Sequence, residues 1–138
     1  MNVTYIFVYG LLKSMYNNEP ARLIRKNCTL IGEGSFPGKL IDIGSYPGAL
    51  YEPDSQTLVH GEVYKIDRNK EKLAEFLDRF EGVGEQFNQP NEYVRQVIPV
   101  LVGDEELYAS CYLYNWNYDG LKVIASGRYV NKDGIRNK

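Results

Sequence analysis

The sequence predicts an α+β fold: a small mixed β-barrel or curled sheet with a helix packed against it. Most of the 138 residues form short segments rich in Val, Ile, Leu and Tyr, and turn residues separate them. Only one segment has strong helical periodicity. Strands and helices do not alternate along the chain, which disfavours a Rossmann-type parallel sheet. The length suits a single domain over 1–138.

Short strands account for most of the predicted structure. Turn signals lie between them at Phe36-Pro37-Gly38, Tyr46-Pro47-Gly48 and Pro53-Asp54-Ser55. Gly103-Asp104 indicates a hairpin connection between the last two strands. The predicted strands are 3–9, 29–34, 38–43, 49–52, 56–66, 93–102 and 107–116.

One helix is predicted over 67–82. Asp67 can cap its N-terminus, and Gly82 is suited to end it. The side chains of Leu73, Phe76, Leu77 and Phe80 recur at the spacing of one buried stripe. A second helix is expected at 19–26, following Asn17-Asn18.

Composition and charge exclude several classes of protein. The net charge is −2 and no basic stripe is present, so we expect no nucleic-acid partner. No apolar run is long enough to span a bilayer, and the N-terminus does not resemble a secretory signal. We therefore expect a cytoplasmic monomer with no membrane partner. Cys28 and Cys111 are far apart in the sequence and are expected to be reduced, partly buried thiols.

The sequence contains one histidine, His60, which lies in a predicted strand. A zinc site or a Ser-His-Asp triad would have to use this residue, and a structural role on a strand face is favoured. We therefore expect no metal site. An enzyme with this composition would rely on carboxylates, hydroxyls and backbone groups.

One carboxylate of the predicted helix occupies an unusual position. At about 100° per residue, Glu71, Glu75 and Asp78 fall on the face opposite the apolar stripe, whereas Glu81 falls at its flank. Glu81 is also at the helix C-terminus, where the macrodipole disfavours negative charge. Both positions raise a carboxyl pKa, as a general acid/base requires. The alternative is that the helix end frays and Glu81 points into water.

Five short motifs occur in order along the chain: FVYGLLK at 7–13, YPGALYE at 46–52, VHGEVYKID at 59–67, LDRFEG at 77–82 and YVRQVIPV at 93–100. Together they resemble the γ-glutamylcyclotransferase-like family, in its AIG2-like and γ-glutamylamine cyclotransferase branch. A further segment, IASGRYV at 124–130, resembles the late S-G-aromatic segment of that family. The resemblance spans essentially the whole chain.

The resemblance implies a small β-barrel with flanking helices and a cavity, and an enzyme that converts γ-glutamyl compounds to 5-oxoproline and a free amine or amino acid. It implies that Glu81 is the acid/base and that Tyr9-Gly10-Leu11-Leu12 binds the substrate through backbone groups. The reaction that it implies needs no metal and no cofactor. Gly10 would let this backbone approach a ligand closely, and the N–H groups that follow would form an oxyanion hole. The alternative for Gly10 is a simple tight turn.

Some positions depart from the family pattern or leave two roles open. Leu11 replaces the usual threonine, which puts activity in question if the hydroxyl orients the loop or the substrate. Tyr93 could donate a hydrogen bond near Glu81 or be an ordinary strand tyrosine. Arg95 could bind a substrate carboxylate, although an ion pair is favoured. The alternative function is a non-catalytic protein that keeps the fold and binds a small amine or amino acid.

Overall fold

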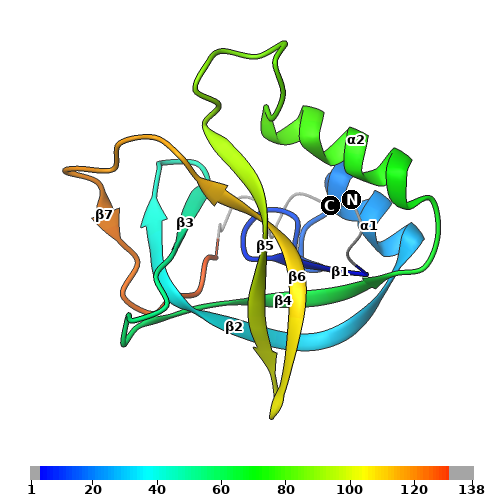
Figure 1. The fold of residues 1–138 in the computed structure, drawn as a ribbon, viewed down its shortest axis with the longest axis horizontal. Coiled ribbons are helices and arrows are strands. Elements are labelled where there is room, and N and C mark those ends of the chain that lie inside the picture. Colours follow the sequence, from blue (N-terminus) through cyan, green and yellow to red (C-terminus); the bar gives the residue numbers. More distant parts are fainter. Residues whose placement is uncertain (1–3, 131–138) are drawn as a thin grey trace.

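The computed structural model describes residues 4–130 of the chain (Figure 1). None of the helices in this part is long and apolar enough to cross a membrane. The elements, in chain order, are β1 (Tyr5–Val8), α1 (Glu19–Asn27), β2 (Cys28–Asp42), β3 (Pro47–Tyr51), β4 (Leu58–Ile66), α2 (Lys70–Glu81), β5 (Tyr93–Val102), β6 (Glu105–Tyr114) and β7 (Lys122–Val123).

Five strands form a closed, mixed barrel in the order β2-β4-β1-β6-β5, which confirms the predicted α+β class. Pairing of β1 with β6 is parallel, and the other barrel pairs are antiparallel. The barrel closes where Ser35 of β2 pairs with Leu101 of β5. In Figure 1, α1 and α2 lie together beside the barrel, while β3 and β7 extend β2 on the other side.

The alternation of side chains along β1 divides the apolar core into two parts. Phe7 points into the barrel, where it packs with Phe36, Val63 and other buried residues. Ile6 and Val8 point outward into a second cluster that includes residues of both helices. This two-residue period is that of a strand buried on both faces. Because β1 is held from both sides, the loop that follows it begins from a fixed point.

Two predicted strands are one in the structure. The predicted turn at Phe36-Pro37-Gly38 is wrong, because β2 runs without a break through Pro37 and Gly38. Here the strand leaves its partner β4 and pairs with β3 instead. At this corner, a Cβ on Gly38 would lie 1.9 Å from the carbonyl oxygen of Leu50. Pro and Gly therefore mark a change of partner inside a strand rather than its end.

The remaining strand predictions agree with the structure to within about two residues, except that β7 was not predicted. The predicted first strand also includes Val3, which lies outside the described residues. Gly103 has a φ of 61° in the predicted β5–β6 hairpin. Cys28 and Cys111 are free and buried, as expected.

Helix α2 differs from the prediction at its N-terminus. It begins at Lys70 rather than 67, and its N-cap residue is Asn69, which makes no side-chain cap. Asn69 instead donates to the side chain of Asn27, while Asp67 accepts a hydrogen bond from Thr29. The cap prediction failed because tertiary partners on α1 and β2 compete for these polar groups.

Candidate active site

A cavity of about 250 Å³ opens where β1 ends, at the side of the barrel covered by α2. All of the residues predicted for the site line it: Tyr9, Gly10, Leu11, Leu12, Glu81 and Tyr93. They come from the loop after β1, the last turn of α2 and the start of β5. The structure therefore brings together three motifs that are far apart in the sequence.

The loop after β1 is anchored at several points. The side-chain amide of Asn18 donates to the carbonyl of Leu11 at 2.7 Å while its oxygen caps α1. Ser14 donates from both its backbone N–H and its hydroxyl to the carboxylate of Glu62, each at 2.7 Å. The Nζ of Lys13 donates to the carbonyl of Tyr129 at 2.7 Å. These bonds hold the loop to α1, β4 and the chain after β7.

Three consecutive backbone N–H groups of this loop are available for a ligand. Within residues 4–130, those of Gly10, Leu11 and Leu12 have no hydrogen-bond acceptor, whereas the N–H of Lys13 donates to Gly10. Buried backbone donors are rarely left without a partner. A run of free N–H groups on a cavity wall therefore favours the binding of an oxyanion or a carboxylate there.

Gly10 is required by a close approach of two loops. A Cβ at this position would lie 2.8 Å from the Cγ of Pro47, too close for an unchanged structure. The backbone at Gly10 thus packs directly on the turn that contains Tyr46 and Pro47. The close approach is to this neighbouring turn, and it brings both loops onto the same cavity.

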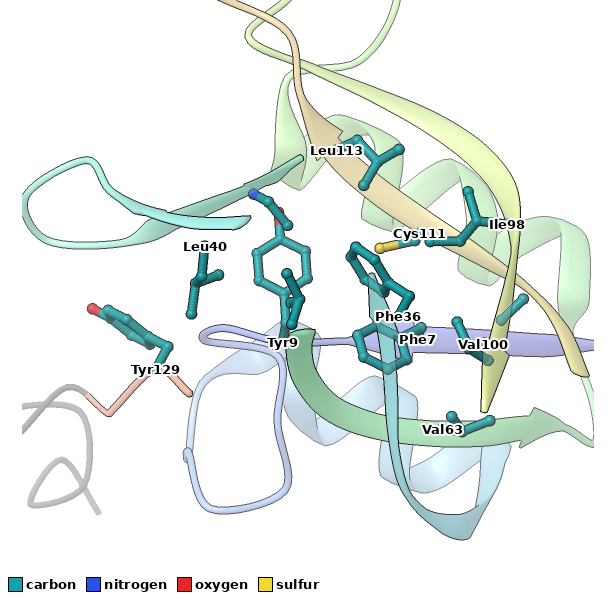
Figure 2. Close-up of a cluster of buried hydrophobic side chains, with 13 residues drawn as sticks. Phe7, Tyr9, Phe36, Leu40, Val63, Ile98, Val100, Cys111, Leu113 and Tyr129 are labelled. Atoms are coloured by element: carbon teal, nitrogen blue, oxygen red, sulfur yellow. The ribbon is translucent and has the colours of Figure 1, made fainter. Parts of the chain in front are cut away.

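Tyr9 contributes to the core as well as to the cavity. Figure 2 shows its ring among the buried side chains inside the barrel. Its hydroxyl donates to the carbonyl of Tyr112 at 2.7 Å and accepts from the N–H of Ala49 at 3.2 Å. The hydroxyl is thus committed to the backbone of β6 and β3. We assign Tyr9 the role of fixing where the loop leaves the barrel.

Glu81 is the last residue of α2, and its direction is fixed by the helix end. Gly82 adopts a φ of 72°, and the N–H groups of Gly82 and Val83 donate to Arg79 and Asp78 in a Schellman arrangement. The residue as a whole is partly exposed, but its carboxyl group is largely buried. Burial, followed by the nearby charge of Glu92, raises the pKa of Glu81 to about 7.

Tyr93 lies on the cavity wall with its hydroxyl already engaged. The hydroxyl donates to the carbonyl of Pro47 at 2.6 Å. Burial and then the charge of Glu81 hold the pKa of Tyr93 far above its usual value. The phenol therefore stays protonated. No group of residues 4–130 donates to its oxygen, which can accept a hydrogen bond from an ammonium group.

Three polar residues of the cavity were not predicted, namely Tyr46, Glu92 and Tyr112. The hydroxyl of Tyr46 donates to the carboxylate of Glu92 at 2.7 Å, and both residues line the cavity. Tyr46 opens one of the sequence motifs and could have been noticed there. Glu92 gave no signal, because it ends an irregular loop whose path only the folded chain defines.

Asp78 is not a solvent charge, contrary to the helical-wheel prediction. Its carboxylate accepts from Arg95 of β5 at 2.8 Å and from the hydroxyl of Tyr112 of β6 at 2.6 Å. Arg95 thus forms an ion pair and does not line the cavity. The prediction for Asp78 failed because β5 and β6 contact the flank of α2 and not only its apolar stripe.

Phe80 also differs from its prediction. It was expected in the buried stripe, but it is 47% exposed and lines the cavity.

Replacing Asp78 by Asn is expected to lower the free energy of unfolding by about 1–3 kcal/mol. The value lies between those of exposed and buried ion pairs, because both side chains are partly buried. Urea unfolding followed by circular dichroism measures the change. Glu75→Gln, an exposed change on the same helix, is the control and should stay within about 0.5 kcal/mol of wild type. Equal stability of Asp78→Asn and wild type would contradict a structural role for this pair.

No group of three or more His, Cys, Asp or Glu side chains is placed to hold a metal ion in the described part of the chain. His60 lies on β4 and is not among the residues of the cavity wall. The groups available for chemistry in this cavity are therefore two carboxylates, tyrosine hydroxyls and backbone amides.

The chain matches known proteins over almost its whole length. The sequence profile described as gamma-glutamyl cyclotransferase, AIG2-like, matches residues 6–131. The gamma-glutamylcyclotransferase family protein YtfP of Escherichia coli (strain K12) is 39% identical over 129 residues, covering 93% of this chain and 97% of the relative. The gamma-glutamylaminecyclotransferase of Mus musculus is 31% identical over 124 residues, covering 81% and 77%.

Solved structures are also similar to the chain over almost its whole length. The crystal structure of an AIG2-like protein from Mus musculus has a TM-score of 0.70 at 26% identity, covering 96% of this chain and 91% of that chain. The solution structure of ytfP from Escherichia coli has a TM-score of 0.60 at 35% identity, covering 94% and 98%.

Proposed function

Because the chain belongs to the AIG2-like γ-glutamylcyclotransferase family, we propose that it is an enzyme that cyclises a γ-glutamyl amine or γ-glutamyl amino acid to 5-oxoproline and releases the amine. One observation carries the proposal. A carboxyl group with a pKa of about 7 shares a cavity with three backbone N–H groups that have no acceptor in the described structure.

The proposed reaction is a ring closure within one molecule. The α-amine nitrogen attacks the δ-carbonyl carbon, and a carbon–nitrogen bond forms while the bond to the leaving amine breaks. Glu81 takes the proton that the α-amine loses and returns it to the leaving nitrogen. One carboxylate acts first as base and then as acid, and a pKa near neutrality suits both steps.

The loop would stabilise the charge that develops on the carbonyl oxygen. The amides of Gly10, Leu11 and Leu12 are donors of fixed direction, since the loop is anchored at both ends. Leu11 replaces a threonine of the family pattern, and main-chain contacts tolerate this change. Leu11 packs against the barrel core and Leu12 against the second cluster, so both side chains hold the loop in place.

The activity is tested by measuring 5-oxoproline release from a panel of γ-glutamyl amines and γ-glutamyl amino acids. Wild type, Glu81→Gln and Glu75→Gln are assayed side by side. We expect release by wild type and Glu75→Gln, and its loss in Glu81→Gln. Absence of release with every compound would overturn the enzymatic proposal. Binding of the same compounds by the folded protein would then identify a non-catalytic small-molecule-binding protein.

We also propose that the enzyme acts in the cytoplasm as a monomer on a small substrate, with no cofactor and no nucleic-acid or membrane partner. Light scattering during size-exclusion chromatography tests the oligomeric state, and a mass of twice 15.8 kDa would contradict the monomer.

A further inference from the structure

The charge of the cavity restricts what its substrate can carry. Glu81 and Glu92 both line it, while none of its described lining residues is Lys, Arg or His. Nearby basic side chains are directed elsewhere: Lys13 to the carbonyl of Tyr129 and Arg95 to Asp78. Within residues 4–130, the cavity therefore has two acidic groups and no positive side chain to balance them.

Glu92 is held in place by its surroundings. The hydroxyl of Tyr46 donates to one carboxylate oxygen of Glu92 at 2.7 Å. The backbone carbonyl of Glu92 accepts from the N–H of Asn115 at 2.7 Å. The preceding residue, Asn91, donates to the carbonyls of Gly84 and Asn88 and accepts from the N–H of Gly84, which fixes the loop before β5. Burial and the bond to Glu92 raise the pKa of Tyr46 to about 12, so this phenol remains a donor at neutral pH.

The proposed reaction does not use Glu92. One carboxylate suffices for the proton transfers, and Glu81 is assigned that role. A second, fixed carboxylate on the same wall still repels negative charge and attracts positive charge in a partly desolvated space. A ligand that brings a cation to Glu92 also relieves the repulsion between the two carboxylates.

We propose that Glu92, positioned by Tyr46, is a specificity-determining residue that binds a positive charge on the leaving amine of the substrate. This inference rests on the proposed function and deepens it. The preferred substrates are γ-glutamyl derivatives of small amines that carry a second ammonium group. Substrates whose leaving group carries a carboxylate and no such cation are disfavoured.

The size of the cavity agrees with a small leaving group. Its volume of about 250 Å³ lies below the range of roughly 300–1,000 Å³ that is typical of small-molecule sites. A γ-glutamyl group with a short diamine is a compact ligand, whereas a peptide chain would extend out of the cavity.

The test compares three γ-glutamyl amides that differ in one terminal group. The leaving amines are 1,4-diaminobutane, pentylamine and 5-aminopentanoate, which end in an ammonium, a methyl and a carboxylate. For wild type we expect kcat/KM to be about tenfold higher for the ammonium compound than for the methyl compound, and lowest for the carboxylate compound. Glu92→Gln should remove most of this difference, and Tyr46→Phe should reduce it. Glu85→Gln, an exposed change in the same loop, should leave it unchanged.

The ratio between compounds isolates the effect of Glu92 on the leaving group. Any influence of Glu92→Gln on the pKa of Glu81 acts on all three compounds equally and cancels in the ratio. Equal kcat/KM values for the three compounds in wild type would overturn the proposal while leaving the cyclotransferase activity intact. An equal loss for all three in Glu92→Gln would also overturn it, because Glu92 would then bind the α-ammonium that they share.

Absence of turnover with every compound would instead count against the proposed function. Dissociation constants of the same three compounds, measured by calorimetry on wild type and Glu92→Gln, then decide the inference. Tighter binding of the ammonium compound by wild type alone supports it, and equal binding of the three overturns it.

Discussion

Replacing Glu81 by Gln is expected to lower kcat by two to four orders of magnitude, because glutamine keeps the shape of the side chain but cannot move the proton. This range is that of general acid–base catalysis. In wild type, kcat/KM should rise with pH through about 7, since the base has to be ionised and its pKa is raised to about that value. Glu81 interacts electrostatically with Glu92, with the phenols of Tyr9, Tyr46 and Tyr93, and with the thiol of Cys111. Burial raises the pKa of each of these phenols and of the thiol well above its usual value, so none of them titrates in this range.

The same change is expected to stabilise the fold above neutral pH. The pKa of Glu81 is raised from 4.5 in the free carboxyl group to about 7 in the folded protein, so the fold favours the protonated form. Below about pH 4.5 the carboxyl group is protonated in both the folded and the unfolded chain, so it does not lower the free energy of unfolding. As the pH rises to about 7, the unfolded chain releases the proton first, and wild type loses stability. The full loss is on the order of 3 kcal/mol.

Glutamine does not titrate and avoids this loss. The stability difference between Glu81→Gln and wild type should therefore be near zero at pH 4.5 and on the order of 3 kcal/mol in favour of the variant at pH 8. Urea unfolding at the two pH values measures it, with Glu75→Gln as the exposed control. If the variant were no more stable than wild type at pH 8, the carboxyl group would be well solvated. A gain in stability with a loss of activity is expected for an active-site group.

Replacing Gly61 by Ala is expected to destabilise the fold by about 2–4 kcal/mol and to lower kcat/KM at least tenfold in the protein that remains folded. A Cβ at this position would lie 2.3 Å from the carbonyl oxygen of Val8 and 2.8 Å from the ring of Phe7. Neither neighbour can move freely, because Val8 is paired in the barrel and Phe7 fills its core.

The effect on activity follows from where the clash falls. Val8 ends β1, directly before the loop that lines the cavity, and the next residue of β4, Glu62, anchors the far end of that loop through Ser14. Separating β4 from β1 therefore shifts both ends of the loop at once. Lys65→Ala, at an exposed site on the same strand, is the control. A Gly61→Ala protein with the activity and stability of wild type would contradict this account of the loop.

The local patterns in the sequence predicted most of the secondary structure. The apolar periodicity of α2, the capping glycine at position 82 and the β5–β6 hairpin are visible in the sequence because neighbouring residues produce them. Two predictions failed where a distant partner competes with local preference. Asp67 does not cap α2, and Pro37-Gly38 does not end a strand, because α1 and β2 in the first case and β3 in the second provide other contacts.

The sequence predicted only those residues of the candidate site that lie in recognisable motifs. Glu81 and the loop at 9–12 lie in recognisable stretches, and the structure places them on one cavity. Glu92 could not be predicted, since its position depends on the path of the loop before β5 and on a hydroxyl group 46 residues away. The role of Asp78 was hidden for the same reason, because its partners are on β5 and β6.

The sequence by itself determined most of the elements, the end of α2 at Glu81 and the glycine after β1, since these depend on interactions between near neighbours along the chain. Only the tertiary structure decided that Gly10 and Gly61 are required by the residues packed against them, that Asp78 is paired, and that a second carboxylate shares the cavity with Glu81. Close approach and charge pairing depend on distances in space, and barrel closure sets those distances between residues far apart in the sequence.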